Sequence, residues 1–337
     1  MSAAAGGARR TAAILGGGVI GGGWAARFLL SGWDVRAFDP DPQAERKLGE
    51  VLENARRALP ALLDAPLPAE GALSWHASAA EAVQGAEWVQ ESAPERLEIK
   101  APLLAEATAA APDAIVASST SGFRPSQLQE GLKDPSRLIV AHPFNPVYLL
   151  PLVEVVAGAR TAPDAPARAA RILSSLGMKP LVVRREIDAH IADRLMEAVW
   201  REALWLIRDD VCTTEELDDA IRLGFGLRWA QMGLFETFRI AGGEAGMAHF
   251  LAQFGPALKW PWSRLTDVPE LDAALSEKIA GQSDAQSGAR SIRELERIRD
   301  ANLVAIMRAL KPGDWGAGAA INAHEARLAE EKPASSD

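Results

Sequence analysis

A glycine-rich turn between a predicted strand and a predicted helix constrains this chain more than any other feature. An apolar run over Thr11–Leu15 is followed by Gly16, Gly18 and Gly21, with the spacing G-x-G-x-x-G. In a strand–turn–helix unit, the first glycine permits the tight turn and the second lets the backbone approach a pyrophosphate. The third lets the helix pack closely on the strand. The pattern therefore predicts a nucleotide site at the start of a parallel α/β sheet.

Asp39 indicates which dinucleotide this turn would bind. A second strand is predicted over Asp34–Phe38, and Asp39 stands at its end, 18 residues after Gly21. Its carboxylate can accept hydrogen bonds from ribose hydroxyls and would repel a 2′-phosphate. The helix start at Val19 and Ile20 would hold the pyrophosphate, because free N–H groups there favour an anion. The predicted cofactor is NAD rather than NADP.

Strands and helices alternate through the first half of the chain, and helices alone follow. Strands are predicted at residues 11–15, 34–38, 73–76, 86–91, 114–118, 137–141, 152–156 and 180–183. Strands spaced by helices indicate a mostly parallel sheet covered on both faces, a Rossmann-type α/β fold. We expect a disordered tail over 1–10, the nucleotide-binding domain over 11–187, an all-helical domain over 188–311 and a loosely ordered tail over 312–337.

Composition excludes several classes of protein. The 337 residues carry a formal charge of −9, which argues against nucleic acid or an anionic membrane as partner. Cys212 is the single cysteine, so the chain has no internal disulfide, and the histidines lack metal-ligand spacing. No run of 18 uncharged apolar residues occurs. We expect a cytoplasmic protein without a metal.

His142 and Glu154 are the candidate chemical groups. His142 ends a predicted strand, and Glu154, 12 residues later, interrupts an apolar one. A carboxylate among Leu and Val needs a partner to offset its desolvation. Paired with His142, it would fix the imidazole tautomer and stabilise the imidazolium formed when His142 takes a proton. The alternative is a core histidine with Glu154 on a solvated edge, which is the more common arrangement for an isolated histidine.

A set of motifs in order resembles the L-3-hydroxyacyl-CoA dehydrogenase family. Besides the glycine turn, these are Glu95–Lys100, Ser118–Ser121, His142–Pro146 and Leu152–Val155. The resemblance covers roughly residues 11–250. It implies a nucleotide-binding domain followed by a helical domain used for dimerisation and substrate binding, and it favours the catalytic interpretation of the histidine.

The resemblance also implies a role for each matching residue. His142 would be the general base with Glu154 as its partner, Ser118 and Asn145 would bind the reacting oxygen or position substrate, Ser121 would contact substrate, and Asp39, Glu95 and Lys100 would contact NAD. Ser118 also follows from position alone, because it ends a central strand where ligands meet an open sheet.

Departures from the family concern the substrate. Members acting on CoA esters carry an asparagine where this chain has Asp193, and the second half is rich in tryptophan. Aromatic faces bind cations, so Trp229, Phe254, Trp260 and Trp262 are candidates for holding a trimethylammonium group, with Asp193 as a further attraction. We therefore predict a dehydrogenase for a small 3-hydroxy acid with a quaternary ammonium group.

Two alternatives stay open, and one assembly is expected. The substrate could be another 3-hydroxy acid, such as L-gulonate or an L-3-hydroxyacyl-CoA, or the fold could serve an inactive NAD-binding structural protein. Amphipathic helices from Asp188 to Leu310 have more apolar surface than one layer can cover, which predicts a homodimer.

Overall fold

The chain forms two compact units. The computed structural model describes residues 9–230, 233–241, 246–254, 262–264, 270, 272–287 and 289–330. Unit 1 combines the residues up to Ala192 with those from Asp300 onward, and unit 2 comprises Asp193–Arg299. None of the helices in the described part is long and apolar enough to cross a membrane.

Unit 1 is built on an eight-stranded sheet with the order β3-β2-β1-β4-β5-β6-β7-β8. Only the pair β6–β7 is antiparallel; every other neighbouring pair is parallel. The strands are β1 (Thr11–Leu15), β2 (Asp34–Phe38), β3 (Leu73–Trp75), β4 (Trp88–Glu91), β5 (Ile115–Ser118), β6 (Leu138–Pro143), β7 (Leu152–Ala157) and β8 (Lys179–Val183). The predicted α/β fold with a mostly parallel sheet is confirmed.

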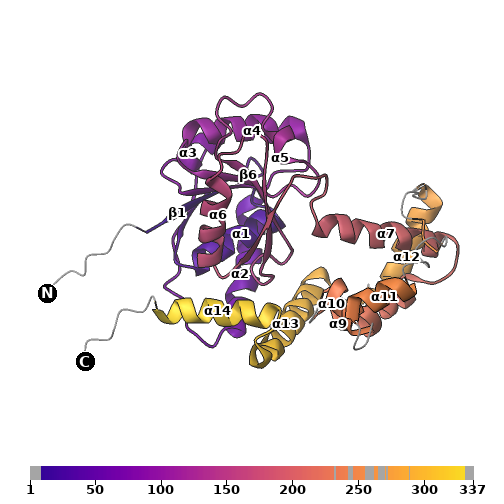
Figure 1. Ribbon diagram of the computed structural model, residues 1–337. Coiled ribbons are helices and arrows are strands. Elements are labelled where there is room, and N and C mark those ends of the chain that lie inside the picture. Colours follow the sequence, from indigo (N-terminus) through magenta and orange to yellow (C-terminus); the bar gives the residue numbers. More distant parts are fainter. Residues whose placement is uncertain are drawn as a thin grey trace, which may run out of the picture. The chain divides into compact units, whose positions relative to one another are not determined.

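Helices cover both faces of this sheet, as Figure 1 shows. One core lies under α1 (Val19–Leu30), α2 (Ala44–Leu62) and α6 (Ala165–Ser175), and the other under α3 (Ala79–Val83), α4 (Leu97–Ala110) and α5 (Pro125–Leu128). The first core contains the tilted rings of Trp24, Phe28 and Trp88. Because α1 is buried from Gly21 to Leu30, the glycine turn before it is held by the packing of a whole helix.

The C-terminal residues correct one expectation. Residues after Pro312 were expected to be loosely ordered, but α14 (Ala317–Glu330) is a helix of unit 1, with Ile321 and His324 buried. Its alanine-rich sequence favours a helix, and Ile321 gives that helix an apolar face. Burial lowers the pKa of His324 to about 4, so its imidazole is neutral at neutral pH. Residues 331–337 lie outside the described residues.

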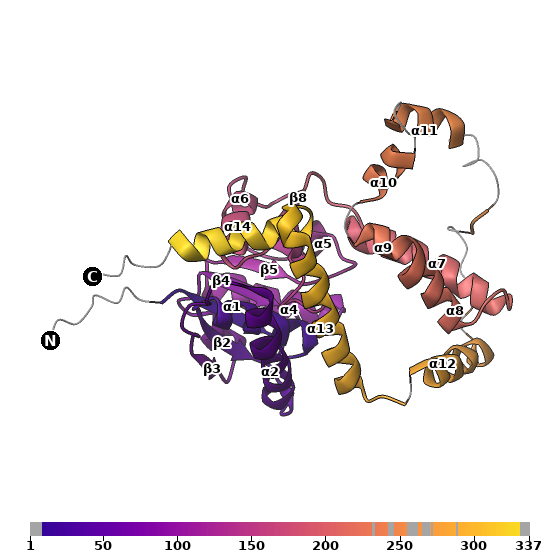
Figure 2. The ribbon, with the colours of Figure 1, turned by 90° about the horizontal axis from the view of Figure 1, so that it is seen from below.

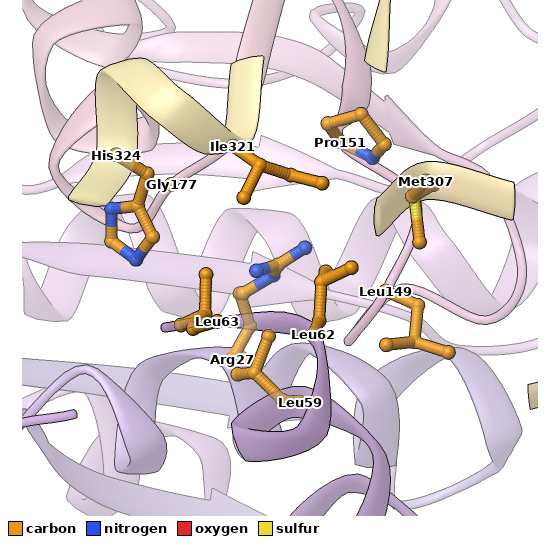
Figure 3. Close-up of a pocket in the computed structure, with 10 residues that line it drawn as sticks. All are labelled: Arg27, Leu59, Leu62, Leu63, Leu149, Pro151, Gly177, Met307, Ile321 and His324. Atoms are coloured by element: carbon orange, nitrogen blue, oxygen red, sulfur yellow. The ribbon is translucent and has the colours of Figure 1, made fainter. Parts of the chain in front are cut away.

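The segment between Arg299 and α14 also belongs to unit 1. Helix α13 (Ile292–Leu310) crosses the boundary of the units, and its Asp300 accepts a hydrogen bond from Tyr148 at 2.6 Å. Lys311 pairs with Asp64 and Glu325. Figure 2 shows α14 lying along unit 1, and Figure 3 shows side chains from α1, α2, α13 and α14 around a small cavity.

Every secondary-structure element in the described part of unit 2 is a helix. Its elements are α7 (Ala192–Arg208), α8 (Thr214–Asp219), a π-helical turn (Ala220–Phe225), α9 (Gly226–Trp229), α10 (Leu234–Ala241), α11 (Gly246–Phe254) and α12 (Ala273–Ser287). Thr213 and Glu216 form the capping box that starts α8. The all-helical second region agrees with the sequence, although this unit ends at Arg299 rather than near residue 311.

Candidate active site

The three motif glycines of the turn differ in their surroundings: two of them have no room for a side chain, and the third borders open space. Gly16 has φ +109°, and a Cβ there would lie 2.7 Å from the Ser92 carbonyl oxygen. A Cβ on Gly21 would lie 1.8 Å from the Gly16 oxygen, whereas a Cβ on Gly18 would meet no atom within 4 Å. Gly18 is the N-cap of α1 and borders open space. The turn therefore offers unobstructed backbone at a helix N-terminus, which suits a pyrophosphate.

A cleft of about 670 Å³ runs beside this turn in unit 1. It is lined by Gly16, Gly18, Phe38, Asp39, Ser92, Pro94, Ile99 and Leu103, among others. Its apolar walls and the few polar groups at its base fit a dinucleotide cofactor. Beside it, Val19 is half exposed at the first turn of α1, and Ile20 packs against the core.

Asp39 is fixed by two backbone donors. Its Oδ2 accepts from the Gly17 N–H at 2.6 Å, and its Oδ1 accepts from the Asp41 N–H at 2.8 Å. The carboxylate thus ties the end of β2 to the glycine turn while it lines the cleft. Asp39 therefore lies where it could accept hydrogen bonds from ribose hydroxyls, as the sequence predicts.

Asp39→Ala is expected to weaken the binding of NAD more than the binding of NADP. The preference of the protein for NAD over NADP should therefore become smaller. The variant loses acceptors for the ribose hydroxyls and a charge that repels a 2′-phosphate. It also frees the Gly17 N–H, so affinity for both cofactors should fall. The measurement is kcat/KM for NAD and NADP with one substrate. An unchanged ratio of the two values would remove Asp39 from cofactor selection.

Lys100 and Ser118 belong to one buried network. Lys100 is 1% exposed, and its Nζ donates to Glu91 at 2.9 Å and to the Ala93 carbonyl at 3.0 Å. Ser118 donates to the other oxygen of the same carboxylate at 2.5 Å. Both residues were expected to touch ligands directly. Ligand contact by both residues stays a prediction; their contacts within the protein support the ends of β4 and β5, next to the cleft.

Glu95 joins this network to the turn that follows β5. Its Oε2 lies 3.3 Å from Lys100 Nζ, and its Oε1 accepts from Thr120 Oγ1 and from the N–H groups of Ser121 and Gly122. Burial raises the pKa of the Glu95 carboxyl. The hydrogen bonds from Thr120 and Gly122, with the charge of Lys100, outweigh this effect, so the pKa lies below its usual value. Glu95 therefore stays ionised and holds the turn Thr120–Gly122.

His142 and Glu154 face each other across the antiparallel strands β6 and β7, in direct register. His142 Nδ1 lies 3.0 Å from Glu154 Oε2, and both side chains are buried. The other oxygen of Glu154 accepts from the N–H groups of Ile191 and Ala192 at 2.9 and 3.1 Å. Burial raises the pKa of the Glu154 carboxyl, but these three bonds lower it below its usual value. An ionised carboxylate can only accept, so Nδ1 carries a hydrogen, and in the neutral form of the imidazole Nε2 offers its lone pair.

Ser121, rather than Ser118, is the serine in contact with this imidazole. Ser121 Oγ lies 3.1 Å from His142 Nε2. Asn145, in the loop after β6, has an exposed side chain and precedes a cis peptide bond to Pro146. The partly buried hydroxyl and the buried imidazole and carboxylate thus form a chain of hydrogen bonds that can accept a proton from an alcohol.

His190 is a residue of this site that the sequence analysis did not single out. It is fully buried, its ring centroid lies 5.3 Å from that of His142, and its Nε2 lies 3.1 Å from the Thr120 carbonyl oxygen. The one available signal was its position, two residues before the helix whose first N–H groups bind Glu154.

Within the described residues, no group of His, Cys, Asp and Glu could hold a metal ion.

The residues predicted to recognise the cationic group of the substrate belong to unit 2. Asp193 is in the first turn of α7. Trp229 packs edge-on against Phe225, with ring centroids 4.6 Å apart, and Phe254 packs against Phe250. Trp229, Phe254 and Trp262 are 43, 46 and 72% exposed. Trp260 lies outside the described residues.

Two family models together match most of the chain. The model for the 3-hydroxyacyl-CoA dehydrogenase NAD binding domain matches residues 11–187, and that for the C-terminal domain matches residues 190–279. The first boundary lies close to the end of unit 1's continuous segment at Ala192.

Curated relatives are highly similar. The chain is 66% identical over 307 residues to the L-carnitine dehydrogenase/betainyl-CoA thioesterase of Ruegeria pomeroyi, covering 91% of this chain and 63% of that protein. It is 58% identical over 323 residues to the L-carnitine dehydrogenase of Mesorhizobium japonicum, covering 93% and 89%. The chain thus spans less than two thirds of the length of the first of these relatives.

Solved structures share the fold. An NAD+-dependent 5-formyl-3-hydroxy-2-methylpyridine 4-carboxylic acid 5-dehydrogenase matches with a TM-score of 0.75 and 29% identity, covering 90% of this chain and 99% of that one. The 3-hydroxybutyryl-CoA dehydrogenase of Escherichia coli matches with a TM-score of 0.58 and 24% identity, covering 81% and 57%. With both family models matched over consecutive segments, the predicted cofactor NAD is confirmed, and the chain belongs to the 3-hydroxyacyl-CoA dehydrogenase family.

Proposed function

We propose that the protein oxidises the 3-hydroxyl of L-carnitine to 3-dehydrocarnitine with NAD. The observation that carries this proposal is the hydrogen-bonded chain Ser121–His142–Glu154, with His142 and Glu154 buried, in the unit that binds the dinucleotide. The names of the relatives, which share 58–66% of aligned residues, support L-carnitine as the substrate.

His142 is the general base of the proposed reaction. Its Nε2 lone pair takes the proton of the substrate hydroxyl, and Ser121 Oγ, which lies beside Nε2, orients the reacting oxygen. Glu154 stabilises the imidazolium that forms, because its negative charge lies 3.0 Å from Nδ1. Bound NAD supplies the hydride acceptor. The glycine turn would bind the pyrophosphate of NAD, and Asp39 would bind its ribose. Asn145 would help to position the substrate.

The proposed substrate carries a permanent positive charge, so aromatic and acidic side chains of the protein are suited to bind it. Trp229, Phe254, Trp260 and Trp262 are the candidates for contact with the trimethylammonium group, because aromatic faces attract cations. Asp193 would add an attraction that an anionic CoA ester would not share. These aromatic residues and Asp193 lie in the half of the chain where the sequence departs from the acyl-CoA enzymes.

A panel of substrates tests this function. With NAD, L-carnitine should give a higher kcat/KM than 3-hydroxybutyrate, its CoA ester or L-gulonate. If one of these three compounds gives a higher kcat/KM than L-carnitine, that compound is the better substrate and the proposal is wrong. If none of the four compounds is turned over, the result favours an NAD-binding protein without catalytic activity.

A tryptophan variant tests recognition of the cation. Trp229→Leu should raise KM for L-carnitine roughly 2- to 30-fold, the equivalent of about 0.5–2 kcal/mol for one cation–π contact, and change KM for 3-hydroxybutyrate little. Trp315→Leu, at a half-exposed tryptophan of unit 1, is the matched control and should change neither. Equal effects of Trp229→Leu on both substrates would return this residue to a packing role.

We also propose that the protein acts as a cytoplasmic homodimer joined through unit 2. Helix α7 exposes 60% of Leu195, 57% of Met196 and 60% of Trp200. An apolar pocket of about 360 Å³ beside it is lined by Val199, Leu206, Ile221 and Phe225, among others. A second copy would remove this surface from water. Light scattering at micromolar concentration gives the mass of the assembly and tests this proposal.

A further inference from the structure

We propose that His190 is a positioning residue for this oxidation: its imidazole N–H holds the Thr120 carbonyl and so keeps the Ser121 hydroxyl on His142. The inference rests on the proposed function for its kinetic consequence. The hydrogen bonds that carry it lie entirely within unit 1.

The hydrogen-bond direction at His190 is fixed by chemistry. Its Nε2 lies 3.1 Å from the Thr120 carbonyl oxygen, which can only accept, so Nε2 carries a hydrogen. The ring is fully buried and tilted 49° to the ring of His142. Because water does not reach this contact, nothing replaces the donor when the imidazole is removed.

The turn that carries Ser121 is held from two sides. On one side Glu95 Oε1 accepts from the N–H groups of Ser121 and Gly122 at 3.1 and 3.0 Å. On the other side His190 donates to the Thr120 carbonyl, and the Ala189 N–H donates to the Gly122 carbonyl at 3.2 Å. The peptide groups on both sides of Ser121 are therefore bonded. The one before it is held at its N–H by Glu95 and at its carbonyl by His190.

The same short segment also holds the far side of His142. Directly after His190, the N–H groups of Ile191 and Ala192 donate to Glu154 Oε1. Ala189 and His190 both have left-handed backbone angles, with φ of +59° and +51°, which are costly for residues other than glycine. This conformation turns the imidazole inward while the next two N–H groups reach Glu154. Residues 189–192 thus fix Glu154 behind the base and Ser121 in front of it.

Two substitutions separate the donor from the bulk of the side chain. His190→Phe keeps a planar ring and removes the N–H, whereas His190→Gln keeps a donor at a similar distance from the backbone. We expect His190→Phe to lower kcat with the best substrate roughly 5- to 50-fold, as for the loss of one buried hydrogen bond. His190→Gln should stay within about threefold of the wild type, and the KM for NAD should change little in both. His76→Phe, at a histidine near β3 that bonds Ser74, is the control and should leave kcat unchanged.

A second measurement does not depend on turnover. Hydrogen exchange of a peptide covering residues 119–123 should accelerate at least about tenfold in His190→Phe, whereas peptides from α6 should exchange as in the wild type. If the wild type oxidises none of the substrates, the proposed function fails, and this exchange result still decides whether His190 holds the turn.

Three results would overturn the proposal. They are wild-type kcat in His190→Phe, an equal loss in His190→Gln and His190→Phe, and unaltered exchange over residues 119–123. A fall in Tm and in NAD affinity that matches the fall in kcat would show general damage to the fold, and it would also count against a positioning role.

Discussion

Replacing His142 with alanine or glutamine is expected to lower turnover by about 10²–10⁴-fold while NAD affinity stays near normal. That range is typical for loss of a general base. His142 contacts Glu154 and Ser121, and it is absent from the residues that line the dinucleotide cleft. The measurements are kcat for L-carnitine and the dissociation constant of NAD from fluorescence titration.

The partner of His142 provides a graded comparison. Glu154→Gln removes the negative charge that stabilises the imidazolium, so it should also slow oxidation, but by less than the loss of the base itself. Retention of at least half of wild-type turnover by either His142 variant would exclude His142 as the base. A Glu154→Gln variant with unchanged activity and pH profile would show that the pair plays no part.

Gly21→Ala is expected to disrupt both folding and NAD binding. The new Cβ would lie 1.8 Å from the Gly16 carbonyl oxygen, which belongs to the backbone and cannot rotate away. Helix α1 must then move from the end of β1, and overpacking of this kind costs about 1–3 kcal/mol or more. We expect a lower Tm and a weaker NAD complex, measured by calorimetry and by fluorescence titration.

Gly49→Ala is the matched control for this variant. Gly49 lies within α2, and a Cβ there would meet no atom within 4 Å. Since alanine favours a helix over glycine by roughly 0.5–1 kcal/mol, the control should keep or raise the Tm and leave NAD binding unchanged. If Gly21→Ala behaves like this control, the close approach of α1 to the turn does not matter for the cofactor.

The nucleotide-binding core could be predicted because its signals are local. Apolar runs that end in glycine or in Asp39 define strands and turns within a few residues of each other. The antiparallel direction of β7 was a missed inference. Only eight residues, 144–151, separate it from β6, and a parallel connection needs about a dozen or more. The helix α14 was missed because its glycine and many alanines show little periodicity, and its burial depends on contacts with distant elements.

In the candidate active site, too, the residues on paired strands could be predicted from the sequence, and those in turns could not. The spacing of His142 and Glu154 placed them opposite each other once the strands were paired, which a hairpin-like connection allows. Ser118 and Ser121 were harder to separate, because the chain leaves the sheet after β5 and the alternation of strand faces no longer applies. The position of the His190 side chain depends on left-handed backbone angles at two residues that are not glycine, and no sequence pattern predicts such angles.

The return of α13 and α14 to unit 1 makes the nucleotide-binding unit discontinuous along the gene. A protein cut after Ala192 would lack Met307, Ile321 and His324, and it would leave Arg27 and Leu59 without the cover shown in Figure 3. Unit 2 is therefore an insertion with two junctions, so exchanging it between relatives requires cuts near residues 192 and 300 together. A module fused after Glu330 would likewise be attached to the unit that binds the dinucleotide.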